Sequence, residues 1–325
     1  METIERCDLC GAHAFAPAYT MPDVHLHPDE WFQVVACQGC GLGFVNPRPA
    51  RAEMGRYYPS GYYHLFFGDK AANERRYARQ ARFLDGITGT DGARPRVLDV
   101  GCADGAFPRF LRDQRGLDAE GLEPHASAGA TGADDLVIHH ADLTQAGLPP
   151  ASYDAITAWA VFEHLHTPAA YFAEVSRLLR PGGRFVFLVT DFDSISSRYL
   201  FREDPPRHLF FFTADTVRRY LEGAGLQLRS RTADDAIYAM EPVYWLSHHL
   251  RRITGRGPLQ FADLPPLPRA WAESKGLAFG PVALLRYALA HPLALLDRLG
   301  TPLYARWQKA TGRYGIVTYV AGKAP

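Results

Sequence analysis

Two pairs of cysteines near the start of the chain have the types and the spacing of a metal site. They form two Cys-x-x-Cys patterns, at Cys7 and Cys10 and at Cys37 and Cys40. Each pattern turns two thiolates toward one centre, and two of them complete a tetrahedral set of four sulfur ligands for zinc. Because all four ligands come from the protein, no position stays open for water or a substrate, and we expect a structural zinc. Four unrelated buried cysteines or a redox pair are the alternative interpretations.

A second chemical signal is the glycine-rich segment RPRVLDVGCADGAFPRFL, residues 94–111. An apolar run ending at Val100 predicts a strand buried in a parallel sheet, and the residues after Gly105 have helical spacing. A tight turn between such a strand and a helix forms a cofactor-binding crevice at the carboxyl edge of a sheet. Glu123 ends the next apolar run, where its carboxylate can accept hydrogen bonds from both hydroxyls of a ribose. Taken alone, a glycine-rich turn is also compatible with a purely structural role.

The elements that must position these residues follow one another regularly along the chain. The sequence predicts strands at 97–100, 117–122, 136–140, 154–159 and 184–190, and helices at 107–115 and 168–180. A Pro-Gly-Gly sequence ends the second helix, and the segment YGIVTYVAGK, 314–323, supplies a further strand near the end of the chain.

This succession resembles that of the class I S-adenosylmethionine-dependent methyltransferases, over about 94–232 and again over 314–323. The segment VLDVGCADGAF is similar to their first motif, with Ala103 in place of its middle glycine. The resemblance implies an α/β fold with a Rossmann-like sheet of seven strands, of which the last is antiparallel. It also implies S-adenosylmethionine as the cofactor and methyl transfer as the activity.

By the same resemblance, the contacts with the cofactor fall at defined positions. Asp99 would order the glycine turn, Glu123 would hold the ribose, and Asp142 with its neighbour would frame the adenine. Cys102 is expected to be a small buried residue beside the cofactor rather than a nucleophile. The full set expected to bind the cofactor is Asp99, Gly101, Cys102, Ala103, Gly105, Glu123, Asp142, Leu143, Trp159 and Ala160.

Two of the 13 histidines stand out as candidate general bases. A hydroxyl or carbon acceptor needs such a base, whereas the sulfonium methyl is already an activated electrophile. His164 follows the fourth predicted strand, at the edge where substrates bind, although this position is also compatible with a structural role. His208 lies between a Pro-Pro turn and an aromatic run, which is similar to the position of the general base in zinc-containing sugar C-methyltransferases. The alternative is that His208 caps a helix starting near Thr213.

Those sugar enzymes also begin with a double Cys-x-x-Cys module followed by an aromatic segment. Here the segment YYPSGYYHLF, through Tyr57, Tyr58, Tyr62, Tyr63 and His64, is expected either to line the acceptor site or cover the cofactor, or to pack between two domains. The sugar enzymes carry a large additional C-terminal domain, whereas this chain inserts residues 241–311 before its last strand. The insertion has helical apolar periodicity with arginines on its polar side, which predicts either a helical lid or an interfacial helix that reaches a lipid-linked acceptor.

The resulting domain prediction has five parts. They are a zinc ribbon (1–50), an aromatic and helical connector (51–93), the methyltransferase domain (94–240), the helical insertion (241–311) and the last strand (312–325).

Bulk composition narrows the classes of partner. Lys+Arg and Asp+Glu number 35 each, so the formal net charge is zero, which disfavours nucleic acid as a ligand. The first residues carry charges and cysteines where a signal peptide is apolar, which predicts a cytoplasmic protein. Charges and prolines interrupt the longest apolar segment, 277–300, so we expect no transmembrane helix, while peripheral contact through 277–307 stays open.

The sequence thus predicts a cytoplasmic methyltransferase that acts on a small molecule, namely a sugar, a glycan or a natural-product intermediate. An RNA methyltransferase with a zinc ribbon is one alternative. A non-catalytic interaction protein that binds the cofactor is the other.

Overall fold

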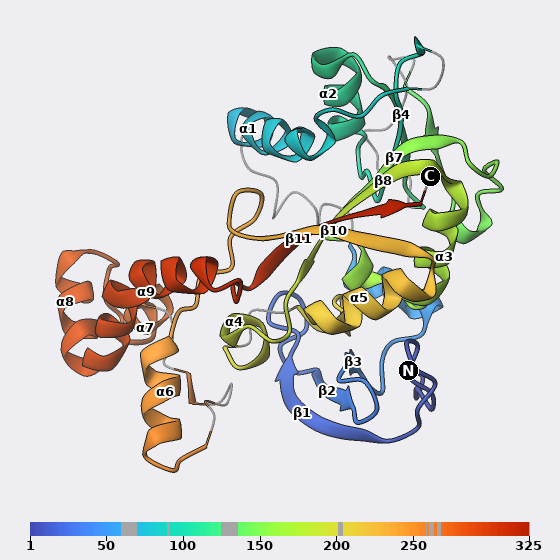
Figure 1. The fold of residues 1–325 in the computed structure, drawn as a ribbon. Helices are drawn as coiled ribbons and strands as arrows, with labels where there is room; N and C mark the ends of the chain where they lie inside the picture. The colour runs from blue at the N-terminus through green and yellow to red at the C-terminus, as the bar shows by residue number, and fades with distance from the viewer. Residues whose placement is uncertain are drawn as a thin grey trace.

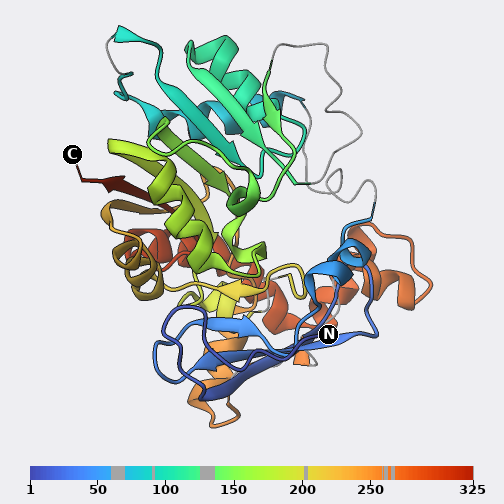
Figure 2. The ribbon, with the colours of Figure 1, turned by 90° about the vertical axis from the view of Figure 1, so that its right-hand side faces the viewer.

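The computed structural model describes residues 1–59, 70–89, 92–124, 136–200, 204–257, 259, 263–264 and 268–324. Figure 1 shows a large central sheet, a smaller sheet below it that contains the N-terminal strands, and a group of helices beyond one end of the large sheet. Seen from the side in Figure 2, the small sheet again lies below the large one.

The large sheet has seven strands in the order β10-β11-β8-β7-β4-β5-β6. Their bounds are β4 (Arg96–Val100), β5 (Asp118–Leu122), β6 (Ile138–His139), β7 (Tyr153–Trp159), β8 (Leu179–Thr190), β10 (Leu226–Ala233) and β11 (Ile316–Lys323). β11 runs antiparallel to both of its neighbours, β8 and β10. The predicted α/β fold, with a seven-stranded Rossmann-like sheet and an antiparallel last strand, is therefore confirmed.

Most strands lie within one or two residues of their predicted bounds, and β6 and β8 differ in ways that matter for the sheet. β6 contains only two residues, shorter than the strand predicted at 136–140. β8 begins at Leu179 and includes the Pro-Gly-Gly sequence, where the register between β7 and β8 shifts. The glycines therefore bulge the start of the strand rather than preceding it.

Helices cover both faces of the large sheet. Their bounds are α1 (Lys70–Ala81), α2 (Ala106–Arg115), α3 (Pro168–Leu178) and α5 (Ala214–Gly223), while the short α4 (Ile195–Arg198) follows β8 and packs in a separate small cluster. The core on one face includes Phe172 of α3 and Tyr220 of α5, which stack on each other, while Phe107 and Leu111 of α2 belong to the core on the other face. All seven residues of β7 are buried, as expected for a central strand covered on both sides.

The N-terminal strands form a separate antiparallel sheet, but they do not complete it alone. β1 (Phe15–Pro22), β2 (Trp31–Cys37) and β3 (Gly43–Val45) are joined by β9 (Phe210–Phe211), which comes from the segment after β8. Val45 N–H donates to the Leu209 carbonyl at 2.9 Å, which extends the pairing of β3 with β9 by one bond. The segment that carries His208 is therefore fixed by the N-terminal module.

The insertion between β10 and β11 contains four helices among its described residues. They are α6 (Trp245–Ile253), α7 (Pro268–Ser274), α8 (Pro281–Ala290) and α9 (Pro292–Ala310). The buried carboxylate of Asp297 accepts hydrogen bonds from the Leu246 and Ser247 amides at the start of α6, and Trp245 stacks on Tyr304 with ring centroids 4.5 Å apart. These helices pack chiefly on one another beyond the end of the sheet (Figure 1). None of the described helices combines the length and apolar character that crossing a membrane requires.

Candidate functional site

The turn between β4 and α2 runs so close to its neighbours that two of its positions require glycine. Gly101 and Gly105 both have left-handed backbone, with φ of 74° and 76°. A Cβ on Gly101 would lie 2.5 Å from Val161 Cγ2, and one on Gly105 would lie 2.7 Å from Ile138 Cδ1. Ala103 also has positive φ, 50°, so alanine adopts here the conformation that glycine favours.

The carboxylate of Glu123 faces this turn from the end of β5. Its side chain is buried, and its Oε2 accepts a hydrogen bond from the Ala103 amide at 3.2 Å. A buried carboxylate beside a turn without bulky side chains suits the two hydroxyls of a ribose, which donate hydrogen bonds. The residues present therefore fit an adenosine-containing cofactor.

Asp99 lies beneath the turn, at the end of β4. Its carboxylate accepts a hydrogen bond of 2.6 Å from the Thr157 hydroxyl on the adjacent strand β7. Burial, and to a smaller extent the charge of Glu123, raises the pKa of Asp99 to about 7 from 3.8. Thr157 ties Asp99 to the neighbouring strand, which suits the predicted role of Asp99 in ordering the turn.

A raised carboxyl pKa makes the stability of the fold depend on pH. The pKa of Asp99 is 3.8 in the unfolded chain and about 7 in the folded chain. The contribution of Asp99 to the free energy of unfolding is therefore fully present below about pH 4 and is lost as the pH rises toward 7. We expect the free energy of unfolding of the wild type, relative to Asp99→Asn, to fall over this range by on the order of 4 kcal/mol. Denaturant titrations at a series of pH values measure this difference, and a difference that rises with pH would contradict it.

The predicted adenine contact, Asp142, already has several partners within the protein. It caps a short 3-10 helix by accepting from the Thr144 amide at 3.0 Å. It also accepts from Arg51 Nη1 and from the Tyr171 hydroxyl, each at 2.5 Å. Leu143 is fully buried behind it. The contact between Asp142 and adenine stays a prediction, and it would share a carboxylate that these donors already orient.

The remaining predicted cofactor residues lie around the same edge of the sheet. Trp159 ends β7 and packs against Phe107 and Phe83, and Ala160 follows it with a positive φ of 57°. Cys102 is buried, and its sulfur lies so close to β5 that a Cβ added to Gly121 would be 2.5 Å from it. Burial raises the pKa of the Cys102 thiol, so it stays protonated and is a poor nucleophile.

His164 and His208, which the sequence offers as rival bases, lie in contact. Their ring centroids are 4.7 Å apart at an interplanar angle of 78°. His164 belongs to a short 3-10 turn, Phe162–His164, which follows Val161 and hence lies beside the glycine turn. The buried Glu163 joins them, and the nearest side-chain nitrogen and oxygen atoms of the three residues lie within 4.8 Å of one another.

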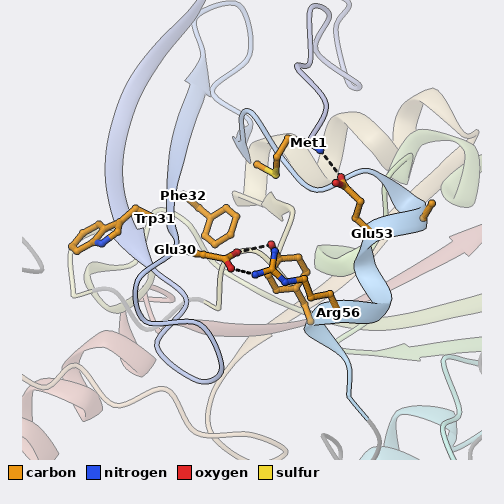
Figure 3. Close-up of a pocket in the computed structure, with 8 residues that line it drawn as sticks. Met1, Glu30, Trp31, Phe32, Glu53 and Arg56 are labelled. Carbon is orange, nitrogen blue, oxygen red and sulfur yellow. Dashed lines mark hydrogen bonds and ion pairs between the residues drawn. The ribbon is translucent and has the colours of Figure 1, made fainter.

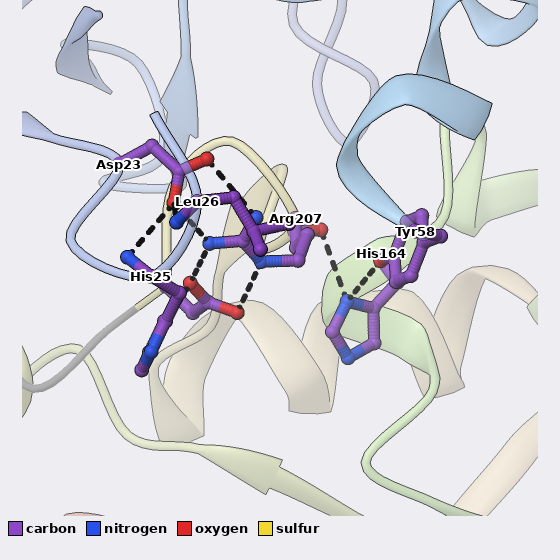
Figure 4. A network of polar contacts seen from close by, with 7 residues as sticks. Asp23, His25, Leu26, Tyr58, His164 and Arg207 are labelled. Atoms are coloured by element: carbon purple, nitrogen blue, oxygen red, sulfur yellow. Dashed lines mark hydrogen bonds and ion pairs between the residues drawn. The ribbon is translucent and has the colours of Figure 1, made fainter. Parts of the chain in front are cut away.

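Burial keeps His164 neutral, and hydrogen bonds fix the orientation of its ring. Its Nδ1 lies 3.0 Å from the Tyr58 hydroxyl and 3.0 Å from the Arg207 carbonyl oxygen (Figure 4). Burial, together with the charge of His208, lowers the pKa of His164 to about 3. A ring with so low a pKa is a weak proton acceptor at neutral pH.

The structure describes two members of the aromatic segment, Tyr57 and Tyr58, and the role of the segment stays a prediction. Tyr58 contacts His164, whereas the hydroxyl of the buried Tyr57 donates to Glu30 of the N-terminal module at 2.9 Å. The other members of the segment, Tyr62, Tyr63 and His64, lie outside the described residues.

A buried ion pair fixes the segment that carries His208. The guanidinium of Arg207 is fully buried and donates to Asp23 of the N-terminal module at 2.6 and 3.2 Å, and to Asp204 at 2.6 Å (Figure 4). Burial alone would raise the pKa of Asp23, but the hydrogen bonds and charge of Arg207 outweigh it and hold that pKa below its ordinary value. Thr213, not His208, caps the following helix α5.

The four cysteines of the N-terminal module converge on one point. Their sulfur atoms lie within 4.8 Å of one another, with Cys7 Sγ 3.5 Å from Cys40 Sγ and Cys10 Sγ 3.6 Å from Cys37 Sγ. Tetrahedral ligands at the usual zinc–sulfur length lie about 3.8 Å apart, so the donor set fits zinc. The amides of Gly11 and Gly41 donate to the carbonyls of Cys7 and Cys37, which closes the two turns.

A cavity of about 490 Å³ in the N-terminal region is separate from the glycine turn. Its lining consists of Met1, Glu30, Trp31, Phe32, Ala52, Glu53, Arg56 and Tyr57 (Figure 3). Glu30 pairs there with Arg56 and Tyr57, so the polar groups of the cavity mainly satisfy one another. The residues predicted to bind the cofactor do not line it, and we do not place the methyl-transfer site there.

Comparison with known proteins identifies the central part of the chain. Residues 72–231 match the profile of a family described as "Methyltransferase domain". A Mycolicibacterium smegmatis protein named "Probable S-adenosylmethionine-dependent methyltransferase" is 34% identical over 41% of this chain and 52% of its own length. The ubiquinone biosynthesis O-methyltransferase of Aeromonas salmonicida is 30% identical over 45% of this chain and 69% of its own length.

The chain thus spans about half the length of the first of these relatives and about two thirds of the second. Among solved structures, the 1,6-didemethyltoxoflavin-N1-methyltransferase of Burkholderia thailandensis superimposes with a TM-score of 0.44 at 17% identity, covering 62% of this chain and 87% of that one.

Proposed function

The chain belongs to the S-adenosylmethionine-dependent methyltransferases, and we propose that it methylates a small molecule at the edge of the sheet where Glu123 and the glycine turn lie, with His208 packed against the neighbouring His164. The observation that carries this proposal is the contact of Val161 with Gly101, since it places the turn of His164 directly beside the predicted cofactor site. His164 in turn lies against His208.

In this proposal the Glu123 carboxylate accepts hydrogen bonds from the ribose hydroxyls of the cofactor. The backbone of residues 101–105 holds the amino-acid part of the cofactor. S-adenosylmethionine supplies an electrophilic methyl group when bound. The protein then needs mainly to align an acceptor atom with that methyl group and to receive the acceptor's proton.

We assign to His208 the role of the base that receives the acceptor's proton. His164 is a weak base because burial, together with the charge of His208, lowers its pKa to about 3. His208 is held in place by the β3–β9 pairing on one side and by the Arg207 ion pairs on the other. His164 would then orient His208 as a neutral partner.

The proposed acceptor is a sugar, a glycan or a natural-product intermediate. Support comes from the similarity of the Cys-x-x-Cys module, the aromatic segment and the histidine before an aromatic run to the zinc-containing sugar methyltransferases. The placement of Tyr58 against His164 adds an aromatic residue from that segment to the site. RNA is the second candidate, and the net charge of zero counts against it.

The proposed zinc has a structural role. Four sulfur ligands leave no open position for a substrate. Its place in the fold gives it an indirect role in catalysis as well, because β3, which follows the second cysteine pair, pairs with β9, which begins two residues after His208. A cytoplasmic location stays a prediction from the sequence.

Calorimetry with S-adenosylmethionine tests the cofactor site. Glu123→Ala leaves two ribose hydroxyls without a charged acceptor and should weaken binding roughly ten- to hundredfold. Asp118→Ala, an exposed acid at the other end of β5, is the matched control and should bind like the wild type. Equal affinities for all three proteins would mean that the ribose binds elsewhere.

Labelled-methyl transfer from the cofactor, screened over sugar nucleotides, glycans and RNA, tests the acceptor class. We expect incorporation into a small molecule. Incorporation into RNA, with binding that weakens steeply with salt, would favour the second candidate.

A further inference from the structure

The helices α8 and α9 expose a row of large apolar side chains that the rest of the described chain does not cover. Leu289 is 75% exposed, Leu303 70% and Leu299 68%. Exposed apolar side chains recur at helical spacing on each helix. We call this set the outer surface: Val282, Leu285, Leu289, Leu296, Leu299, Leu303 and Trp307. The opposite sides of the same helices are buried through Tyr287, Asp297 and Thr301. A helix that is already packed on one side and still apolar on the other marks an interaction surface.

The exposed charges on these two helices are all positive. Arg286, Arg298 and Arg306 are exposed and, among the residues that the structure describes, none of them pairs with a carboxylate. The other cation, Lys309, pairs with Asp235 at 2.6 Å, and the acid of α9, Asp297, is buried beneath α6. The surface thus combines leucines, a tryptophan and arginines within a chain whose net charge is zero.

We propose that the outer surface binds a lipid bilayer that carries anionic head groups. A helix that lies in the plane of such a bilayer combines leucine and tryptophan on its buried face with arginine at the level of the head groups. A second copy of this chain fits less well, because a symmetric contact of two outer surfaces would bring arginines of like charge together in a desolvated interface.

The surface is connected directly to the methyltransferase sheet. Residue 316, a few residues after α9, begins β11 and pairs with Thr190, the last residue of β8. The helices therefore lie beyond the carboxyl ends of the parallel strands (Figure 1), which is the edge where the acceptor is expected. An acceptor held in a bilayer, such as one on a lipid carrier, would be presented to this edge; this last step rests on the proposed function.

Co-sedimentation of the full chain with vesicles tests the proposal. The wild type should sediment with phosphatidylcholine vesicles that contain phosphatidylglycerol, and less with phosphatidylcholine alone. Leu299→Glu combined with Leu303→Glu should abolish sedimentation, because both positions would enter the apolar region. Arg298→Glu and Arg306→Glu should each weaken binding to the anionic vesicles at least about fivefold, and added salt should weaken it too.

Leu228→Glu is the matched control, since Leu228 is an exposed leucine of β10 outside the outer surface, and this variant should sediment like the wild type. Failure of the wild type to sediment, or unchanged sedimentation of the double variant, would overturn the proposal. So would analytical ultracentrifugation that finds the wild type as a dimer and the double variant as a monomer.

Cofactor calorimetry on the same proteins separates this proposal from the proposed function. If the wild type binds the cofactor but not the vesicles, only the proposal of a bilayer-binding surface is contradicted. If it binds the vesicles but not the cofactor, only the proposed methyltransferase function is contradicted.

Discussion

Replacing His208 by alanine is expected to lower turnover by roughly 10²- to 10⁴-fold, the usual contribution of a general base. The affinity for S-adenosylmethionine should stay near that of the wild type, because His208 is assigned to the acceptor's proton and not to the cofactor. Steady-state kinetics with the identified acceptor, together with cofactor calorimetry, measure the two quantities. The acidic limb of the pH–rate profile should disappear as well, since it reports protonation of the base.

His13→Ala is the matched control, because His13 is exposed and is not one of the two candidate bases, His164 and His208. A His208→Ala enzyme that keeps both its rate and the acidic limb would show that His208 only anchors its segment. The same result would be expected if the acceptor were an amine that attacks without a base.

Loss of the proposed zinc is expected to disorder the N-terminal sheet and to impair turnover more than cofactor binding. Zinc held by four cysteines contributes about 10–16 kcal/mol of binding free energy in isolated zinc peptides, and most of it acts as folding free energy. Cys7→Ser should lower the zinc content below one per chain and shift thermal unfolding to lower temperature. Because β3 pairs with β9, the segment of His208 loses a partner when this sheet melts.

Metal analysis and thermal unfolding measure the first two effects, and the ratio of turnover loss to affinity loss measures the third. Cys102→Ala must keep its zinc, since Cys102 lies in the glycine turn, far along the chain from the other four cysteines. A metal-free protein of unchanged stability would contradict the zinc assignment.

The parts of the fold that the sequence predicts are those with local signals. The apolar run of β7, the glycine turn after β4 and the proline that begins α3 each fix an element through a few adjacent residues. β6 is shorter than its apolar pattern suggests, because only Ile138 and His139 pair with β5.

The arrangement of the site depends on contacts that sequence patterns do not record. The three phenylalanines after Leu209 are all buried, and two of them form the strand that completes the N-terminal sheet, which no local pattern indicates. His164 and His208 look like rivals in sequence because nothing local shows that their rings touch.

Sequence patterns also do not indicate which charged side chains are buried. Glu163 and Arg207 belong to residue types that are mostly exposed, and only the tertiary structure supplies their partners. Arg207 finds Asp23, which lies in the N-terminal module, at 2.6 Å. The one available hint was position, since both residues precede a histidine that the sequence had already singled out.

A crystal structure with bound S-adenosylhomocysteine tests the proposed site. We expect both ribose hydroxyls to lie within hydrogen-bond distance of Glu123, the amino-acid part to follow residues 101–105, and the sulfur to face the space beside His208. A nucleoside bound away from Glu123, or a sulfur directed away from the His164–His208 pair, would contradict it.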